Sequence, residues 1–357
     1  MNCKLIGIPE LRWFGSDRLL SEAPAAPPNI TVATATAQNL KPHLDSPGPL
    51  YYKNVMGGGP LTTIHRKAVH FAPTHQPSAL KFHFCPFNGV IQMDSLSQFK
   101  QMQKEAWANF GPFESLTTIP AGNLVRFAGV ARGMRVLDVG CGTGVVAITA
   151  ARTGATVSAI DLTPALLERA QENARIADVS IDFREADAEA LPFGDGEFDV
   201  VLSQFAHIFA PRPEVVTRGM LRVLKPGGIL AFSTWPPELL VGRTFAVTAS
   251  YLPPPPPGVV PPTLWGDPNV IRERLGSAVR DITFTRDCML VPALSPQHFR
   301  GSAERAAGPL VKLVASLSAT DPARLAQLRK DFDAVVVPYH RDNVVRQDYL
   351  LTRSTKL

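Results

Sequence analysis

The chain has 357 residues, 45% of them hydrophobic, and carries a formal net charge of +5 at pH 7. No apolar run approaches the roughly 20 residues that a helix needs to cross a bilayer, so we expect no membrane span. Residues 1–92 hold eight Lys/Arg and four Asp/Glu, whereas residues 93–357 hold 28 and 27. The larger part is almost neutral and lacks the basic balance typical of nucleic-acid binders, so we expect no nucleic-acid partner.

Residues 1–92 differ in composition from the rest of the chain. They contain 11 prolines, five of the eight histidines and the run Gly57-Gly58-Gly59, without an amphipathic period. We interpret them as a disordered or weakly ordered extension, followed by one domain over residues 93–357. Two other origins stay open. In the first, the extension is a targeting segment, because residues 46–92 lack acids. In the second, it lies upstream of the natural start, because Met93 opens a helical pattern.

The four cysteines are isolated in the sequence, at positions 3, 85, 141 and 288. They form no CxxC pair and no Cys/His spacing typical of zinc, and the histidines of the extension are spaced irregularly, so we expect no metal. The N-terminus also lacks the pattern of a secretory signal. Isolated cysteines in such a chain favour a reducing, cytoplasmic location.

From Ser95 onward the hydrophobic pattern becomes that of regular elements. Two helices are predicted first, over residues 95–110 and 119–131. Strands and helices then alternate up to Trp235, where Lys225-Pro226-Gly227-Gly228 ends one of the helices. The predicted strands cover residues 134–139, 156–160, 180–184, 198–203 and 229–234, and the helices between them cover residues 144–153, 164–176 and 213–224.

The alternation predicts an α/β fold with a Rossmann-like, mostly parallel sheet and helices on both faces. It breaks after Trp235, at a tract that includes Pro253–Pro257 and is too poor in backbone donors for a central strand. Two later strands would complete a seven-stranded sheet, and inserted helices would lie over its carboxyl edge as a helical, proline-rich lid. These strands are predicted over residues 281–285 and 347–352, and the helices over residues 297–318 and 321–337.

A glycine-rich turn follows the first predicted strand, where residues 136–144 read Val-Leu-Asp-Val-Gly-Cys-Gly-Thr-Gly. The glycines let the backbone turn sharply and approach a ligand, and the next helix offers unpaired N–H groups. A nicotinamide-dependent enzyme would carry its third small residue at position 145, which is Val, and Asp138 would repel a pyrophosphate. A carboxylate at this position suits a ligand with an ammonium group. We interpret Cys141 as a small residue tolerated in the turn.

At these residues the sequence resembles the class I S-adenosylmethionine-dependent methyltransferases. Further segments match that family in order, over about residues 95–235: Ala159-Ile160-Asp161, residues 185–193, and residues 198–204 followed by 224–228. The resemblance implies S-adenosyl-L-methionine as the cofactor, bound by a core over about residues 130–235, with a substrate-lid region over about 236–340. Within the family the chain looks most like small-molecule methyltransferases of the quinone-biosynthesis type.

The resemblance also implies roles for single residues. The carboxylate of Asp161 would accept both ribose hydroxyls, which suits a cis-diol, and Asp187 with the backbone N–H of Ala188 would read the adenine edge. Ser203 and Gln204 would lie near the methionine portion. The full set of expected cofactor-binding residues is Asp138, Gly140, Cys141, Gly142, Gly144, Asp161, Leu162, Asp187, Ala188, Ser203 and Gln204.

Methyl transfer from a sulfonium is an in-line displacement, so the protein mainly holds the acceptor in a dry site. An acceptor that carries a proton also needs a base, and His207 is the best-placed titratable group. The alternative for His207 is a ring packed between aromatic residues. Trp235 and Trp265 are either pocket walls or structural residues.

Members of the family that methylate nucleic acid carry Asn/Asp-Pro-Pro-Tyr/Phe after the fourth strand. This chain reads Ser203-Gln204-Phe205-Ala206 at that place, which disfavours methylation of a base.

The sequence thus predicts a methyltransferase that acts on a small-molecule acceptor of apolar or aromatic character. Two other functions stay open. One is a non-catalytic S-adenosylmethionine-binding protein, since cofactor motifs do not prove an acceptor site. The other is an NAD-dependent oxidoreductase, which Val145 and Asp138 oppose. The sequence indicates neither the atom that is methylated nor the oligomeric state.

Overall fold

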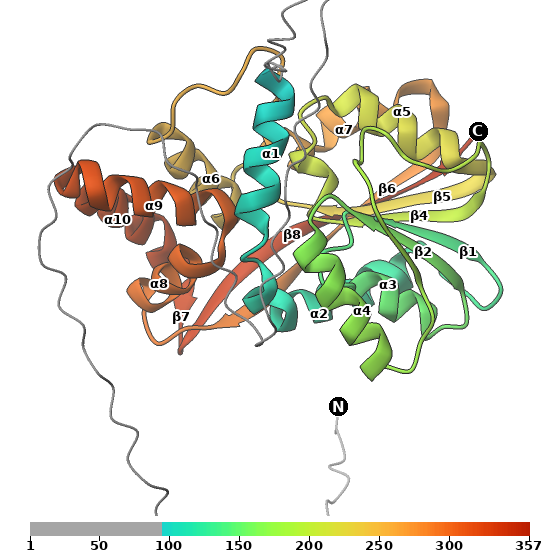
Figure 1. The fold of residues 1–357 in the computed structure, drawn as a ribbon, viewed down its shortest axis with the longest axis horizontal. Coiled ribbons are helices and arrows are strands. Elements are labelled where there is room, and N and C mark those ends of the chain that lie inside the picture. Colours follow the sequence, from blue (N-terminus) through green and yellow to red (C-terminus); the bar gives the residue numbers. More distant parts are fainter. Residues whose placement is uncertain (1–94) are drawn as a thin grey trace, which may run out of the picture. The chain divides into compact units, whose positions relative to one another are not determined.

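A mixed sheet forms the centre of the computed structural model, which describes residues 95–357 (Figure 1). Its strand order is β3-β2-β1-β4-β5-β8-β6, and a short strand β7 pairs with β8. The strands from β1 to β5 are parallel, whereas β8 runs antiparallel to β5 and β6. The strands are β1 (Arg135–Val139), β2 (Thr156–Asp161), β3 (Asp182–Glu185), β4 (Phe198–Gln204), β5 (Leu224–Thr234), β6 (Val279–Pro292), β7 (His340–Arg341) and β8 (Val344–Lys356).

This sheet confirms the expected Rossmann-like fold, with seven strands along its main path and one additional short strand. Its central strands have apolar middle parts, at residues 136–137, 200–202 and 229–232. Leu137 of β1, Leu202 of β4 and Leu230 of β5 have no exposed surface. Parallel strands have such apolar sequences because helices cover both of their faces.

Helices cover the two faces of the sheet (Figure 1). On one face α2 packs against β4, β5, β6, β8 and α3, and on the other α5 packs against β5 and α7. Leu124 of α2 and Met220 of α5 are fully buried, and each such side chain contributes roughly 1.5–3 kcal/mol to stability. These helices are α2 (Glu114–Ala128), α3 (Val145–Ala151), α4 (Pro164–Ile176), α5 (Pro213–Val223) and α7 (Pro268–Leu275).

The predicted boundaries are close in the first half of the domain. α4 has the predicted ends, and Pro164 occupies its first turn, where the missing N–H costs nothing. The second predicted helix starts five residues earlier than expected, at Glu114, and ends at Ala128 instead of residue 131. It ends there because Gly129 adopts a left-handed conformation with φ of 75° and donates its N–H back to Val125 O, which is a common helix terminus.

Residues 236–340 depart further from the prediction. The helices α6 (Leu240–Ser250) and α7 were not predicted, and the single helix expected over residues 297–318 is two helices. They are α8 (Pro296–Ala306) and α9 (Gly308–Thr320), separated where Gly308 has φ of 26° and Pro309 follows. The expected helix over residues 321–337 is α10 (Pro322–Val336).

The helices α6, α8, α9 and α10 pack against one another and form what we call the helical lobe. Between this lobe and the sheet stands α1 (Ser95–Trp107), the first described element (Figure 1). No helix within residues 95–357 is long and apolar enough to cross a membrane. The interpretation of residues 1–92 as a weakly ordered extension lies outside the described residues.

Candidate functional site

The glycine turn joins β1 to α3, and its three glycines are required for different reasons. Gly140, Gly142 and Gly144 all have positive φ, at 72°, 54° and 86°. A Cβ at Gly140 would lie 2.4 Å from the Cβ of Ala206, and one at Gly144 would lie 3.1 Å from that of Ala170. At Gly142 a Cβ would meet no described atom within 4 Å. The turn is therefore packed tightly at both ends and open in the middle.

Asp138 lies on β1 just before this turn and is almost fully buried. Its Oδ2 accepts a hydrogen bond from the backbone N–H of Ala147 at 3.0 Å. Its Oδ1 is buried and has no hydrogen-bond partner among the described residues. Burial, followed by the nearby charge of Asp161, raises the pKa of Asp138 to about 8. At pH 7 the carboxyl is therefore largely protonated in the ligand-free protein. A buried polar atom without a partner is costly, and a cationic ligand would supply a hydrogen bond and favour the ionised form.

Asp161 ends β2 and holds the glycine turn in place. One carboxylate oxygen accepts the backbone N–H of Gly142 at 2.8 Å, and the other accepts that of Thr163, also at 2.8 Å. Burial raises the pKa of Asp161, and these backbone hydrogen bonds counteract it. Each oxygen keeps a further lone pair. Asp161 can thus fix the turn and accept hydroxyl groups together.

Asp187 follows β3, and its carboxylate contacts the ammonium group of Lys100, which the sequence did not indicate as part of the site. Its Oδ1 accepts the backbone N–H of Glu189 at 2.9 Å, and its Oδ2 accepts a hydrogen bond from Lys100 of α1 at 2.5 Å. The neighbouring Ala186 donates its N–H to Asp161 O at 3.0 Å. The acids expected at the ends of β2 and β3 are therefore brought to one edge of the sheet, and α1 lies against it.

Ser203 and Gln204 end β4, and the structure gives them different surroundings. Ser203 is buried, donates its hydroxyl to Val139 O at 2.7 Å and accepts the N–H of His207 at 3.2 Å. Gln204 donates through Nε2 to Thr117 O at 2.9 Å, while its Oε1 is buried without a described partner. Ser203 thus ties two strand ends together, and Gln204 keeps an acceptor oxygen for a ligand.

His207 lies in a 3-10 turn after β4 and is packed by aromatic rings. Its ring contacts Phe232 at 4.7 Å and Trp265 at 4.6 Å between centroids, both edge to face. Neither ring nitrogen has a hydrogen-bond partner among the described residues. Burial, followed by the charge of Arg274, lowers the pKa of His207 to about 3. The ring is therefore neutral at pH 7, and its role as a base stays a prediction that none of these contacts supports.

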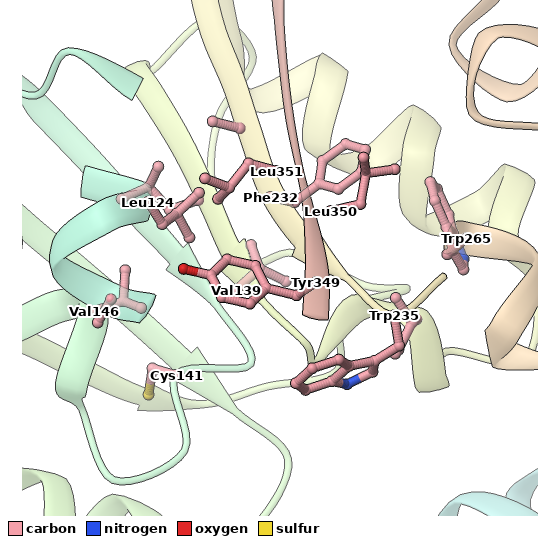
Figure 2. Packing of buried hydrophobic residues seen from close by; sticks show 14 of the residues in the cluster. Leu124, Val139, Cys141, Val146, Phe232, Trp235, Trp265, Tyr349, Leu350 and Leu351 are labelled. Carbon is pink, nitrogen blue, oxygen red and sulfur yellow. The ribbon is translucent and has the colours of Figure 1, made fainter. Parts of the chain in front are cut away.

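Three aromatic rings meet at the carboxyl ends of β4 and β5, beside β8. Phe205 stacks on Trp235 with centroids 3.9 Å apart and planes 14° apart, and Tyr349 meets Phe205 edge to face at 5.6 Å. Figure 2 shows Tyr349 beside Trp235, with its hydroxyl directed toward the side of Leu124. Phe205 has φ of 57°, an unusual conformation for a bulky residue. We call Phe205, Trp235 and Tyr349 the aromatic cluster.

The hydroxyl of Tyr349 belongs to a polar contact that no local motif predicts. It accepts a hydrogen bond from Asn123 Nδ2 at 3.0 Å and donates to Asp287 Oδ2 at 3.2 Å. Asn123 also donates to Asp287 at 2.7 Å. The three residues come from α2, β6 and β8, so only the fold brings them together. Among residues 95–357 no cluster of His, Cys, Asp and Glu has the arrangement of a metal site.

Comparison with known proteins finds a methyltransferase domain in this chain. The family model of that domain matches residues 137–232. An uncharacterized protein of Mycobacterium tuberculosis is 35% identical over 266 residues, which cover 74% of this chain and 93% of that protein. A ubiquinone biosynthesis O-methyltransferase of Xanthomonas oryzae pv. oryzae is 36% identical over 155 residues, 42% of this chain and 64% of that enzyme. The crystal structure of the YcgJ protein of Bacillus subtilis is similar with a TM-score of 0.46 and 17% identity, covering 66% of this chain and 97% of that one.

Proposed function

Because the chain belongs to the class I S-adenosylmethionine-dependent methyltransferases, we propose that it transfers the methyl group of S-adenosylmethionine to a small-molecule acceptor. One observation carries the cofactor part of this proposal. Asp138, Asp161 and Asp187 lie at or just beyond the carboxyl ends of three neighbouring parallel strands, β1, β2 and β3. They flank a glycine turn that is open at Gly142. Ligands of open α/β sheets bind at this edge.

The described side chains suit this cofactor. Asp161 keeps a lone pair on each oxygen for a ribose diol, and Asp187 with Ala188 follows β3 where the adenine is expected. Asp138 Oδ1 and Gln204 Oε1 are buried polar atoms without a described partner. A bound ammonium group would donate hydrogen bonds to them and favour the ionised form of Asp138. When bound, the sulfonium supplies a methyl group that is already activated. The chain itself then has to bind, orient and exclude water.

The aromatic cluster supports an apolar or aromatic acceptor. Phe205 stacks on the buried Trp235 and is itself partly exposed, so it offers apolar ring surface to a ligand. Aromatic partners are favoured by roughly 0.5–1.5 kcal/mol beyond their buried area. The relative from Xanthomonas oryzae is described as a ubiquinone biosynthesis O-methyltransferase, which is in keeping with a small acceptor. Within the cluster, Tyr349 has its pKa raised to about 12 by burial. It is therefore protonated at pH 7 and supplies a hydroxyl, not a base.

Calorimetry tests the cofactor. The full-length protein is titrated separately with S-adenosylhomocysteine, NADH and buffer. We expect saturable binding of S-adenosylhomocysteine with a stoichiometry near one, and none of NADH, because position 145, where a dinucleotide turn needs a small residue, is Val. Binding of NADH without a response to S-adenosylhomocysteine would favour the oxidoreductase alternative and overturn the proposal.

An acceptor screen tests the enzyme. Purified protein and S-adenosylmethionine are incubated with a panel of phenols, quinols, amines and thiols, and release of S-adenosylhomocysteine is measured. We expect turnover with planar apolar acceptors above the rate with short DNA or RNA duplexes. Tight binding of the cofactor without turnover on any class would favour a non-catalytic binding protein. Turnover on nucleic acid alone would contradict a small-molecule acceptor.

A further inference from the structure

The helix α1 carries two lysines that contact the loop after β3. Lys100 Nζ lies 2.5 Å from Asp187 Oδ2 and 2.5 Å from Glu189 Oε2. One helical turn further along, Lys104 pairs with Glu185. The last residue of β3 and the loop after it thus present three carboxylates to one face of a single helix.

The pair between Lys100 and Glu189 is the most buried part of this contact. The Glu189 side chain is 1% exposed and that of Lys100 is 18% exposed. Arg212 also bonds to Glu189, at 2.7 Å. Burial opposes the charge on Lys100, but its hydrogen bonds to Asp187 and Glu189 outweigh burial and raise the pKa of Lys100. The ammonium of Lys100 is therefore charged at neutral pH, and its pair with the buried Glu189 is screened less by salt than an exposed pair.

Lys100 also completes the fixation of Asp187. Oδ1 of that carboxylate accepts the N–H of Glu189, and Oδ2 accepts the ammonium of Lys100. Both oxygens are therefore held, one by the loop itself and one by α1. A carboxylate held from both sides has a defined orientation, and each oxygen keeps a lone pair for another donor.

Other residues of α1, some of them on the same face as Lys100, contact the rest of the domain. Gln103 donates to Phe209 O at 3.0 Å, and the ring of Trp107 lies 4.6 Å from that of Phe209. From the helical lobe, Lys312 of α9 donates to Glu105 at 2.7 Å. Through these contacts α1 bridges the edge that carries Asp161 and Asp187 and the helical lobe. Figure 1 shows α1 between the helical lobe and the sheet.

We propose that Lys100 is the latch of α1: by bridging Asp187 and Glu189 it holds this helix against the adenine side of the cofactor site and orients the Asp187 carboxylate. The inference rests on the proposed function, because it takes the loop after β3 as the adenine site. Release of the cofactor then requires the two contacts of Lys100 to break. Lys100 acts through Asp187 and is a positioning residue.

The test measures dissociation of S-adenosylhomocysteine by surface plasmon resonance from immobilised full-length protein. The variants are Lys100→Met, Lys100→Arg and the matched control Lys330→Met, which removes an exposed lysine of α10. Where a closed segment limits release of a ligand, loss of the contact that closes it acts mainly on the dissociation rate. We expect about tenfold faster dissociation for Lys100→Met, recovery to within about threefold for Lys100→Arg, and the wild-type rate for Lys330→Met.

A second measurement does not depend on the cofactor. Hydrogen–deuterium exchange of residues 95–107 is followed in the ligand-free proteins. We expect faster exchange of this segment in Lys100→Met than in wild type, with unchanged exchange in the central strands. Wild-type rates of both exchange and dissociation in Lys100→Met would overturn the latch, as would slower dissociation. Absence of S-adenosylhomocysteine binding by the wild-type protein would instead overturn the proposed function, and the latch with it.

Discussion

Asp161 accepts the backbone N–H of Gly142, with 2.8 Å between Oδ2 and the amide nitrogen. This bond joins the end of β2 to Gly142. Of the three glycines in the turn, Gly142 is the one at which an added Cβ would meet no described atom within 4 Å. The same carboxylate holds Thr163, the residue before α4. Its position is thus set by the backbone on both sides before any ligand arrives, which is how a binding site avoids reorganisation on binding.

Substituting Asp161 by Asn should weaken cofactor binding more than it weakens the fold. The amide retains one acceptor oxygen but presents an NH₂ group to either Gly142 or Thr163, where an acceptor is needed. Hydrogen bonds to charged groups contribute about 1.5–3 kcal/mol, so we expect at least about tenfold weaker binding of S-adenosylhomocysteine by calorimetry. Asp342→Asn, on an exposed hairpin, is the matched control and should bind as wild type does. Equal affinities of the two variants would contradict the role of Asp161.

The two glycines Gly140 and Gly142 should differ in their tolerance of alanine. A left-handed conformation costs an alanine roughly 1–2 kcal/mol, and both positions have it. At Gly140 the new methyl group would also lie 2.4 Å from Ala206 Cβ, and overpacking adds roughly 1–3 kcal/mol. We expect Gly140→Ala to lower the free energy of unfolding in urea by about 2–5 kcal/mol, and Gly142→Ala by about 1–2 kcal/mol.

The open space at Gly142 reverses this order for ligand binding. A methyl group there would extend into the side of the turn that we propose for the cofactor. Folded Gly142→Ala protein should therefore bind S-adenosylhomocysteine weakly, although it unfolds at a higher urea concentration than Gly140→Ala. A Gly142→Ala variant with unchanged affinity would show that the ligand does not use this side of the turn.

The part of the site that the sequence predicts is local. Asp138, Gly140 and Gly142 lie within five consecutive residues of one strand and turn, so their relative positions follow from that element alone. Asp161 was predictable because it ends the next strand, and parallel strands end at the same edge. The hydrogen bond between Asp161 and Gly142 required only these two adjacent elements.

The parts that the sequence did not predict depend on distant contacts. Lys100 reaches Asp187 across 87 positions, and Asn123 reaches Tyr349 across 226. The helix α6 carries β-branched residues and Gly242 in its interior, which lower its intrinsic helix propensity. Its packing against α10 stabilises it instead, and a Cβ at Gly242 would lie 2.3 Å from Pro236 O. By contrast, the break between α8 and α9 had a local signal in Gly308-Pro309.

His207 should make the protein less stable at mildly acidic pH. Burial lowers its pKa to about 3 in the folded state, from an ordinary value of 6.5. The unfolded chain therefore binds the proton first as pH falls, and stability is present above about pH 6.5 and is lost toward pH 3. The expected slope is about 1.4 kcal/mol per pH unit. Urea unfolding at several pH values measures it.

The variant His207→Leu isolates this contribution. Asp138, whose pKa is raised to about 8, contributes with the opposite sign, because the folded state binds its proton first and stability is lost as pH rises toward 8. The free energy of unfolding of His207→Leu minus that of wild type cancels the contribution of Asp138, and it should become more positive by about 1.4 kcal/mol per pH unit below pH 6.5. A constant difference over this range would show that the ring is not buried as a neutral group. Turnover of His207→Leu within a few-fold of wild type, with the acceptor found in the screen, would remove its role as a base.

Phe205 should reveal backbone strain next to the site. Its φ of 57° is unfavourable for any residue with a Cβ, and the ring is held by stacking on Trp235. Removing the ring by Phe205→Ala leaves the strain in place, whereas Phe205→Gly removes both. In the middle of a regular helix or strand, a glycine variant is less stable than the alanine variant by about 0.5–1 kcal/mol. Here we expect Phe205→Gly to be more stable than Phe205→Ala by about 1 kcal/mol in urea unfolding. The usual order, with alanine more stable, would show that the conformation at Phe205 is not strained. The expected order would show that the stacking of Phe205 on Trp235 is maintained against the preference of the backbone, as is typical of residues that shape a binding site.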